Sequence, residues 1–131
     1  MAKNETQTTK TTLSEELLAL AERAQRRYAK AKADFLEAVR TNPAEAVAWH
    51  GEEMAKAQEP HERLMHVAAF LKDETPETVL REIRDGVAQC IEGFFGGQST
   101  SLFQNAVARA RTEGLVALQR YLDALARQYG L

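Results

Sequence analysis

Asn42-Pro43-Ala44-Glu45 and Thr75-Pro76-Glu77 are the two stretches that decide the fold. In each, a residue whose side chain can cap a helix stands directly before a proline. Proline is tolerated at the first position of a helix because the N–H there has no partner within the helix. Each stretch therefore predicts the start of a helix, and the glycine pair at 96–97 predicts the end of one.

Between these signals the chain divides into four long helical segments, at residues 13–41, 42–74, 75–97 and 98–131. Ser14 is expected to cap the first segment, with Leu13 and Leu18 as a hydrophobic staple. Apolar and small residues recur at spacings of three and four, which is typical of packed helices. No strand-like alternation is present. The sequence predicts an all-α fold, with four long helices in an up-down-up-down bundle.

Pro60 lies inside the second helical segment. The apolar pattern of this segment, which includes Val47, Gly51 and Met65, keeps its phase through the proline. Proline removes one backbone hydrogen bond and clashes with the carbonyl four residues earlier. The segment is therefore expected to be either one helix kinked at Pro60 or two helices separated there.

The length of 131 residues fits one domain. Residues 1–12 are polar and are expected to form a disordered tail, followed by a single domain at residues 13–131. The tail lacks the apolar region of a secretory signal, and no stretch approaches the ~18 apolar residues of a membrane span. The single cysteine, Cys90, permits no disulfide within the chain. We expect a cytoplasmic protein with no membrane partner.

No group of residues has the spacing of a catalytic or cofactor-binding motif. The three histidines, His50, His61 and His66, all lie in the second segment. A di-iron bundle instead needs a Glu-x-x-His pair on each of two helices. Cys90 falls on an apolar seam, where a thiol is buried and unreactive. We expect no metal, no other cofactor and no enzymatic activity.

Trp49 is the apolar residue that fits the helical pattern least well. It lies far around the helix from Val47, on the same side as Val67 and Leu71 if the helix continues through Pro60. Either the helix packs on two neighbours, or Trp49 marks an interface with another chain, where tryptophan is enriched. Phe94 and Phe95 give adjacent faces of the third helix a large ring each, so either one ring points outward or Phe95 folds under the glycine loop. The predicted protein interface comprises Trp49, Val67, Leu71 and Phe95, and the partner is another protein or a second copy of the chain in a homo-oligomer.

Basic residues form stripes on the first and last helices: Arg23, Arg27 and Lys30, and Arg109, Arg120 and Arg127. In an up-down bundle these two helices are neighbours, so they would give the domain one mildly basic side and one acidic side. Such stripes can contact phosphates. A solvated face is the simpler interpretation, because Asp34 and Glu37 continue the first stripe with opposite charge, and the net charge is −2.

Taken together, these features predict a non-enzymatic protein-protein interaction protein that acts through its helix faces, as an adaptor, an inhibitor or an assembly subunit. The alternative is a nucleic-acid-binding helical protein that uses the two basic stripes.

Overall fold

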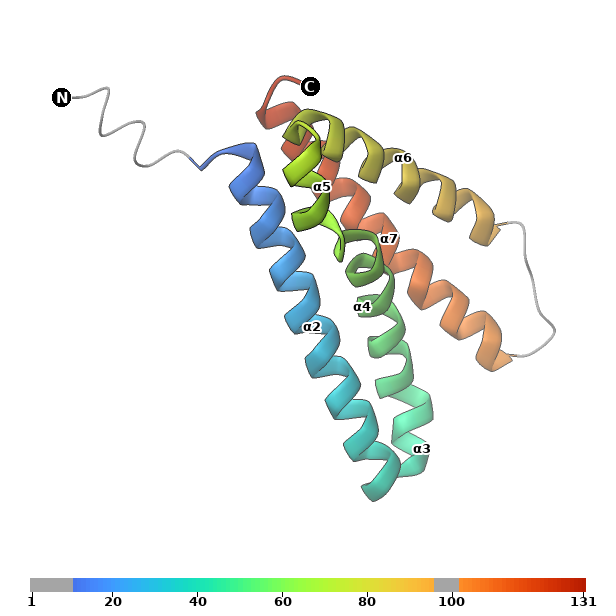
Figure 1. The fold of residues 1–131 in the computed structure, drawn as a ribbon. Helices are drawn as coiled ribbons and strands as arrows, with labels where there is room; N and C mark the ends of the chain where they lie inside the picture. Colours follow the sequence, from blue (N-terminus) through green and yellow to red (C-terminus); the bar gives the residue numbers. More distant parts are fainter. Residues whose placement is uncertain (1–10, 96–101) are drawn as a thin grey trace.

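The computed structural model describes residues 11–95 and 102–131, without the side chains of residues 94, 95 and 102–105. The predicted tail over residues 1–10 and the glycine pair at 96–97 lie outside these ranges. Within them the regular structure is helical, with no strand, which confirms the all-α fold (Figure 1). The single-domain boundary at residue 13 stays a prediction, as does the up-down-up-down order.

The helical segments follow the predicted divisions closely. The elements are α2 (Leu13–Thr41), α3 (Pro43–Glu45), the π-helical turn η1 (Ala46–His50), α4 (Gly51–Leu64), α5 (Val67–Asp73), α6 (Pro76–Phe95) and α7 (Leu102–Gln128). The second predicted segment is thus divided among α3, η1, α4 and α5, whereas each of the others forms one long helix.

Both proline-based helix starts are confirmed. The Asn42 Oδ1 accepts a hydrogen bond from the Glu45 backbone N–H at 3.3 Å. The Thr75 Oγ1 accepts one from the Thr78 backbone N–H, also at 3.3 Å. Each cap satisfies a donor that the first helical turn leaves free, and the proline that follows needs none.

The cap of α2 differs from the prediction. Thr12, not Ser14, is the N-cap, and its Oγ1 accepts a hydrogen bond from the Glu15 N–H at 3.1 Å. The helix therefore begins at Leu13, and both Leu13 and Leu17 reach the core. Burial of these two leucines explains the earlier start, and it brings Thr12 out of the predicted tail into the fold.

The interruption of the second segment lies after Pro60 and not at it. Helix α4 continues through Pro60 to Leu64, and a turn at Met65 and His66 separates it from α5. Pro60 has no N–H to donate to the Lys56 carbonyl, four residues earlier. This carbonyl instead faces α7, where a Cβ on Gly114 would lie only 2.1 Å from its oxygen. Close packing on α7 holds α4 together where the proline weakens it.

The π-helical turn changes which face of the second segment is buried. Ala46 and Gly51 are both buried and lie five residues apart, as expected across a turn wider than that of an α-helix. Val47, predicted to lie on the apolar seam, is 53% exposed. The prediction for Val47 is wrong because one wide turn shifts the helical phase.

The hydrophobic core lies toward one end of the molecule. It is built from the start of α2, the end of α4, and α5, α6 and α7, with Leu17, Leu64, Val79, Leu115 and Leu122 among its most buried members. Residues 31–50 extend beyond it as a helical hairpin, which we call the arm (Figure 1). The buried residues of the arm are the alanines Ala38 and Ala46. The arm therefore contributes little to the core.

Helix α4 packs against both α2 and α7 and lies between them (Figure 1). The first and last helices are therefore not the direct neighbours that were expected, and they meet chiefly through side chains. The Arg23 Nη2 donates to the Tyr121 Oη at 3.0 Å, and the Tyr129 Oη donates to the Thr11 carbonyl at 2.6 Å. One continuous basic side across these two helices does not form.

An ion pair between the buried Glu59 and the partly exposed Arg111 fastens α4 to α7. Glu59 is 3% exposed, and its Oε1 accepts hydrogen bonds from both Nε and Nη2 of Arg111, with the Nε at 2.8 Å. Near it, the Lys56 Nζ lies 3.4 Å from the Glu113 carboxylate. Partial burial lowers the pKa of Lys56, but the Glu53 and Glu113 carboxylates raise it by more, so the pKa lies above its ordinary value.

Replacing Gly114 with alanine tests the close approach of α4 and α7. The added methyl group would force the helices apart, at a cost of about 1–3 kcal/mol, whereas alanine gains at most about 1 kcal/mol over glycine in a helix. We expect Gly114→Ala to lower the free energy of unfolding in urea, followed by circular dichroism. In Gly86→Ala, the matched control, the added Cβ has no atom within 4 Å, so this variant should be as stable as the wild type or more so. A Gly114→Ala variant as stable as the Gly86→Ala control would contradict the close contact.

The ion pair gives a second prediction for the same helix pair. Arg111→Met leaves the buried Glu59 carboxylate without its charged donor and should cost about 2–3 kcal/mol of unfolding free energy. The double variant Glu59→Met/Arg111→Met removes both charges and should recover most of this loss, because apolar replacements of buried ion pairs are often neutral. Urea unfolding of the two variants measures the difference. A double variant as unstable as Arg111→Met would show that the buried charge is not the cause.

Candidate functional site

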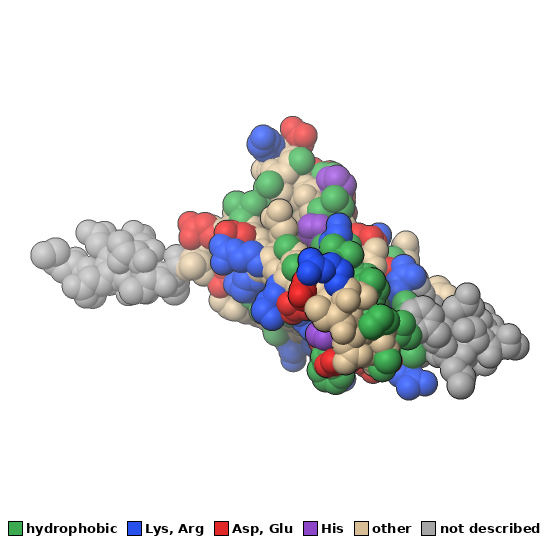
Figure 2. Space-filling model, turned by 90° about the horizontal axis from the view of Figure 1, so that it is seen from below, with side chains coloured by type: hydrophobic (Ala, Val, Ile, Leu, Met, Phe, Trp, Pro, Cys, Tyr) green, Lys and Arg blue, Asp and Glu red, His purple; other side chains and the backbone are tan. Residues whose placement is uncertain are grey.

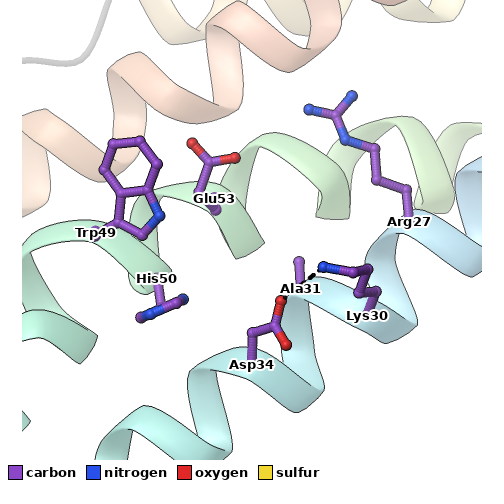
Figure 3. A pocket seen from close by; sticks show the side chains of 7 residues that line it. All are labelled: Arg27, Lys30, Ala31, Asp34, Trp49, His50 and Glu53. Carbon is purple, nitrogen blue, oxygen red and sulfur yellow. Dashed lines mark hydrogen bonds and ion pairs between the residues drawn. The ribbon is translucent and has the colours of Figure 1, made fainter. Parts of the chain in front are cut away.

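Trp49 lies on η1 at the side of the arm and is 60% exposed. The second segment does pack on two neighbours, since α4 contacts both α2 and α7, but the exposed Trp49 ring takes little part in that packing, and its role in an interface stays a prediction. Figure 3 shows Trp49, His50 and Glu53 beside the α2 side chains Arg27, Lys30, Ala31 and Asp34, which together line a shallow pocket of about 270 Å³. The π-helical turn sets the direction of Trp49, and such turns are frequent at functional sites.

The charges of the Trp49 pocket are largely compensated. The Lys30 Nζ lies 3.2 Å from the Asp34 carboxylate (Figure 3). The Glu53 carboxylate lies 3.4 Å from the Lys56 Nζ, outside the pocket. Arg27 has no ion-pair partner among the described residues. The pocket therefore combines an exposed indole ring with one uncompensated cation, which suits binding more than acid–base chemistry.

The opposite flank of the arm carries three exposed hydrophobic side chains, which we call the arm flank. Leu36 and Val39 on α2 are 54% and 46% exposed, and Val47 on η1 is 53% exposed. None of them lines the Trp49 pocket, and the helical phase places them on the other side of the hairpin. Seen from below, hydrophobic side chains surround the end of the arm among charged ones (Figure 2).

The other predicted interface residues do not join Trp49. Val67 is 1% exposed and belongs to the core, and Leu71 is partly buried against it. Both lie on α5, at the far end of the segment from η1 (Figure 1). The side chain of Phe95 lies outside the described residues. The predicted grouping assumed one continuous helix, but the π-helical turn and the Met65–His66 turn both change the helical phase.

The two basic stripes line different pockets, which adjoin at Ala117. Arg23 is held by Tyr121, with its guanidinium 5.7 Å from the ring centroid, and Lys30 is paired with Asp34. Arg109 and Arg120 line a separate shallow pocket on α7, and Arg127 is exposed near the end of that helix. Of the α2 stripe, Arg27 is the residue without a partner among the described residues. The contacts of Arg23 and Lys30 reduce the number of cations available to phosphates, and the nucleic-acid alternative stays a prediction.

A groove between α2 and α7 is the feature that sequence reasoning missed. Its floor is formed by α4, through Ala57, Pro60 and Leu64, and its volume is about 430 Å³. We call it the central groove. The one sign of the groove in the sequence is the presence of small residues, Ala57, Gly114 and Ala117. Small residues are found equally at helix pairs that pack tightly and leave no groove. The groove requires α4 to lie between α2 and α7, which local patterns do not reveal.

Chemical groups for catalysis are not gathered in the part of the chain that the structure describes. No three His, Cys, Asp or Glu side chains in residues 11–95 and 102–131 are placed to hold a metal ion. Cys90 is partly buried against the core, and the His61 ring stacks on Tyr28 with centroids 5.0 Å apart. In the same ranges, no helix is both long and apolar enough to cross a membrane.

Comparison with known proteins does not assign the chain to a family. No protein-family model, no curated protein and no solved structure matches it. Its function is therefore inferred from the surfaces described above.

Trp49 is the only tryptophan in the chain, so its fluorescence reports this site alone. We expect an emission maximum close to that of the urea-unfolded protein, and acrylamide quenching nearly as strong, because the ring is 60% exposed. Far-ultraviolet circular dichroism on the same sample confirms that the helices are folded. A strongly blue-shifted, poorly quenched emission from folded monomer would contradict the placement of Trp49.

Proposed function

We propose that the protein is a non-enzymatic protein-protein interaction protein that uses the helix faces of the arm. The observation that carries this proposal is the exposure of large hydrophobic side chains on both flanks of the arm: Trp49 on one, and Leu36, Val39 and Val47 on the other. Exposed hydrophobic side chains that cluster are typical of interaction sites. We expect a second copy of the chain or another protein to cover them.

The free energy gained by burying these four side chains limits how tightly they alone could hold a partner. Full burial of a large apolar side chain contributes about 1.5–3 kcal/mol, so each of these half-exposed side chains contributes about 1 kcal/mol. The sum, about 4 kcal/mol, is at the lower end of the cost of association. The interface must therefore extend beyond these four residues, and the uncompensated Arg27 beside Trp49 lies where a polar contact would add to it.

The alternative, a nucleic-acid-binding helical protein, has less support than the protein-interaction proposal. Of the six arginines and lysines in the predicted stripes, Arg23 and Lys30 already have partners on this chain. Arg109 and Arg120 line a different pocket from Arg27. Fewer unengaged cations on one surface mean fewer phosphate contacts and a weaker dependence of affinity on salt.

Two substitutions on the arm test the proposed function. Val39→Glu on the arm flank should weaken association at least about tenfold, because it would bury an unpaired charge. Trp49→Ala beside the pocket should weaken it about fivefold, which corresponds to the ~1 kcal/mol that burial of the ring contributes. Phe70→Glu is the matched control, since Phe70 is 46% exposed but lies on α5. Sedimentation velocity over a range of concentrations measures self-association. Affinity capture from lysate treated with nuclease detects other proteins.

The outcomes separate the possible partners. Self-association that the arm variants abolish and the control retains supports a homo-oligomer, and a stoichiometric captured protein lost in the same variants supports an adaptor or inhibitor. A wild-type chain that stays monomeric and captures no protein would overturn the proposal. Loss of the captured proteins after nuclease treatment, together with an affinity for nucleic acid that falls steeply with salt, would favour the nucleic-acid alternative.

A further inference from the structure

The central groove is long enough to hold two turns of a helix. On α2 its lining extends from Leu20 to Arg27, and on α7 from Gly114 to Tyr121. At 1.5 Å per residue, each wall is about 10 Å long. Helices that bind in grooves are held by apolar side chains at positions i, i+3 or i+4, and i+7, which also cover two turns.

Small side chains form much of the groove surface. Ala24 lies on the α2 wall, Ala57 on the floor, and Gly114 and Ala117 on the α7 wall, while Leu64 and Leu118 provide larger apolar contacts. Helices pack with their axes about 8–10 Å apart when the residues between them are small. These small residues would let a helix approach the floor closely once the Arg23–Tyr121 hydrogen bond, which joins the two walls, opens.

The charge of the groove selects for acidic partners. Its lining contains two arginines, Arg23 and Arg27, and no carboxylate. Arg27 has no ion-pair partner among the described residues, and Arg23 donates to the neutral hydroxyl of Tyr121 at 3.0 Å. A carboxylate is a stronger acceptor than a phenol. An acidic side chain at this edge would therefore take over the Arg23 hydrogen bond and compensate the Arg27 charge.

We propose that the central groove binds an amphipathic helix of a protein partner, with the apolar face of that helix on α4 and acidic side chains against Arg23 and Arg27. Every described wall of the groove is helical, so no free strand edge is present there to pair with an extended peptide. The groove shares Arg27 with the Trp49 pocket but none of the exposed hydrophobic residues of the arm, so the proposal goes beyond the proposed function of the arm and stands without it.

The test is a selection from a display library of helical peptides of about four turns, made on the wild-type chain and counter-selected on Ala117→Phe. Ala117 is exposed and lines both the groove and the neighbouring pocket of Arg109 and Arg120, so the added ring obstructs this edge without entering the core, and Arg27→Glu and Arg109→Glu show which of the two sites the peptide uses. Enriched peptides are then measured by fluorescence anisotropy against four proteins: wild type, Ala117→Phe, Arg27→Glu and Arg109→Glu. Arg109→Glu is the control, because Arg109 is an exposed arginine of α7 outside the groove.

We expect the enriched peptides to carry apolar residues at i, i+3 or i+4, and i+7, with Asp or Glu beside them. Arg27→Glu should weaken their binding about tenfold by placing like charges together, Ala117→Phe should weaken it at least as much, and Arg109→Glu should leave it unchanged. Two further variants measured in the same way, Val39→Glu on the arm flank and Trp49→Ala beside the pocket, should also leave it unchanged. Because Arg27 lines both the Trp49 pocket and the groove, these two variants distinguish a failure here from a failure of the arm.

Three results would overturn the proposal: no peptide whose binding depends on Ala117, enriched peptides without acidic residues, or equal binding to wild type and Arg27→Glu. The same anisotropy experiment includes decanoate as a competitor. If decanoate binds in a manner sensitive to Ala117→Phe while no peptide does, the groove is a site for small apolar carboxylates and the helix proposal is wrong.

Discussion

The contact between Gly114 and the Lys56 carbonyl determines how the two halves of the chain meet. Pro60 leaves this carbonyl without its helical donor, and the absence of a side chain on Gly114 lets α7 approach it directly. One Cα–H bond of the glycine points at the oxygen, a weak but favourable contact. The Glu59–Arg111 pair then fixes the same crossing with charge-assisted hydrogen bonds. With α4 held against α7, α2 can reach α7 only through side chains, and the central groove results.

This arrangement gives one helical segment two roles. Helix α4 forms the floor of the central groove, and the π-helical turn directly before it carries Trp49 and Val47 into solvent. The arm and the groove are thus different surfaces built on the same α2–α4 hairpin. A protein with two such surfaces is suited to hold two partners at once, or one partner and a second copy of itself, which is the arrangement that an adaptor or an assembly subunit requires.

The parts of this fold that depend on neighbouring residues could be predicted from the sequence, and those that depend on distant ones could not. The caps at Asn42 and Thr75 involve residues three positions apart, so both helix starts were predicted correctly. Pro60 was expected either to kink its helix or to divide it in two, because the sequence does not show that Gly114 packs there. The exposure of Trp49 was one of two open interpretations, whereas the burial of Val67 was missed because the helical phase changes twice between them. The groove, formed by three helices, has no local signal.

The position of the core has a consequence for how the molecule opens. Leucine, isoleucine and valine side chains hold one end together, whereas the arm is closed chiefly by Ala38, Ala46 and the Phe35 ring near Gly51. Regions with few buried contacts exchange their amide hydrogens through local openings that cost much less than global unfolding. Amide protection should therefore decrease along α2 from Leu17 toward Thr41, with the arm opening as a unit while the core stays closed. A partner bound at the arm would slow amide exchange there. The exchange rate of the hairpin would therefore report whether a partner is bound.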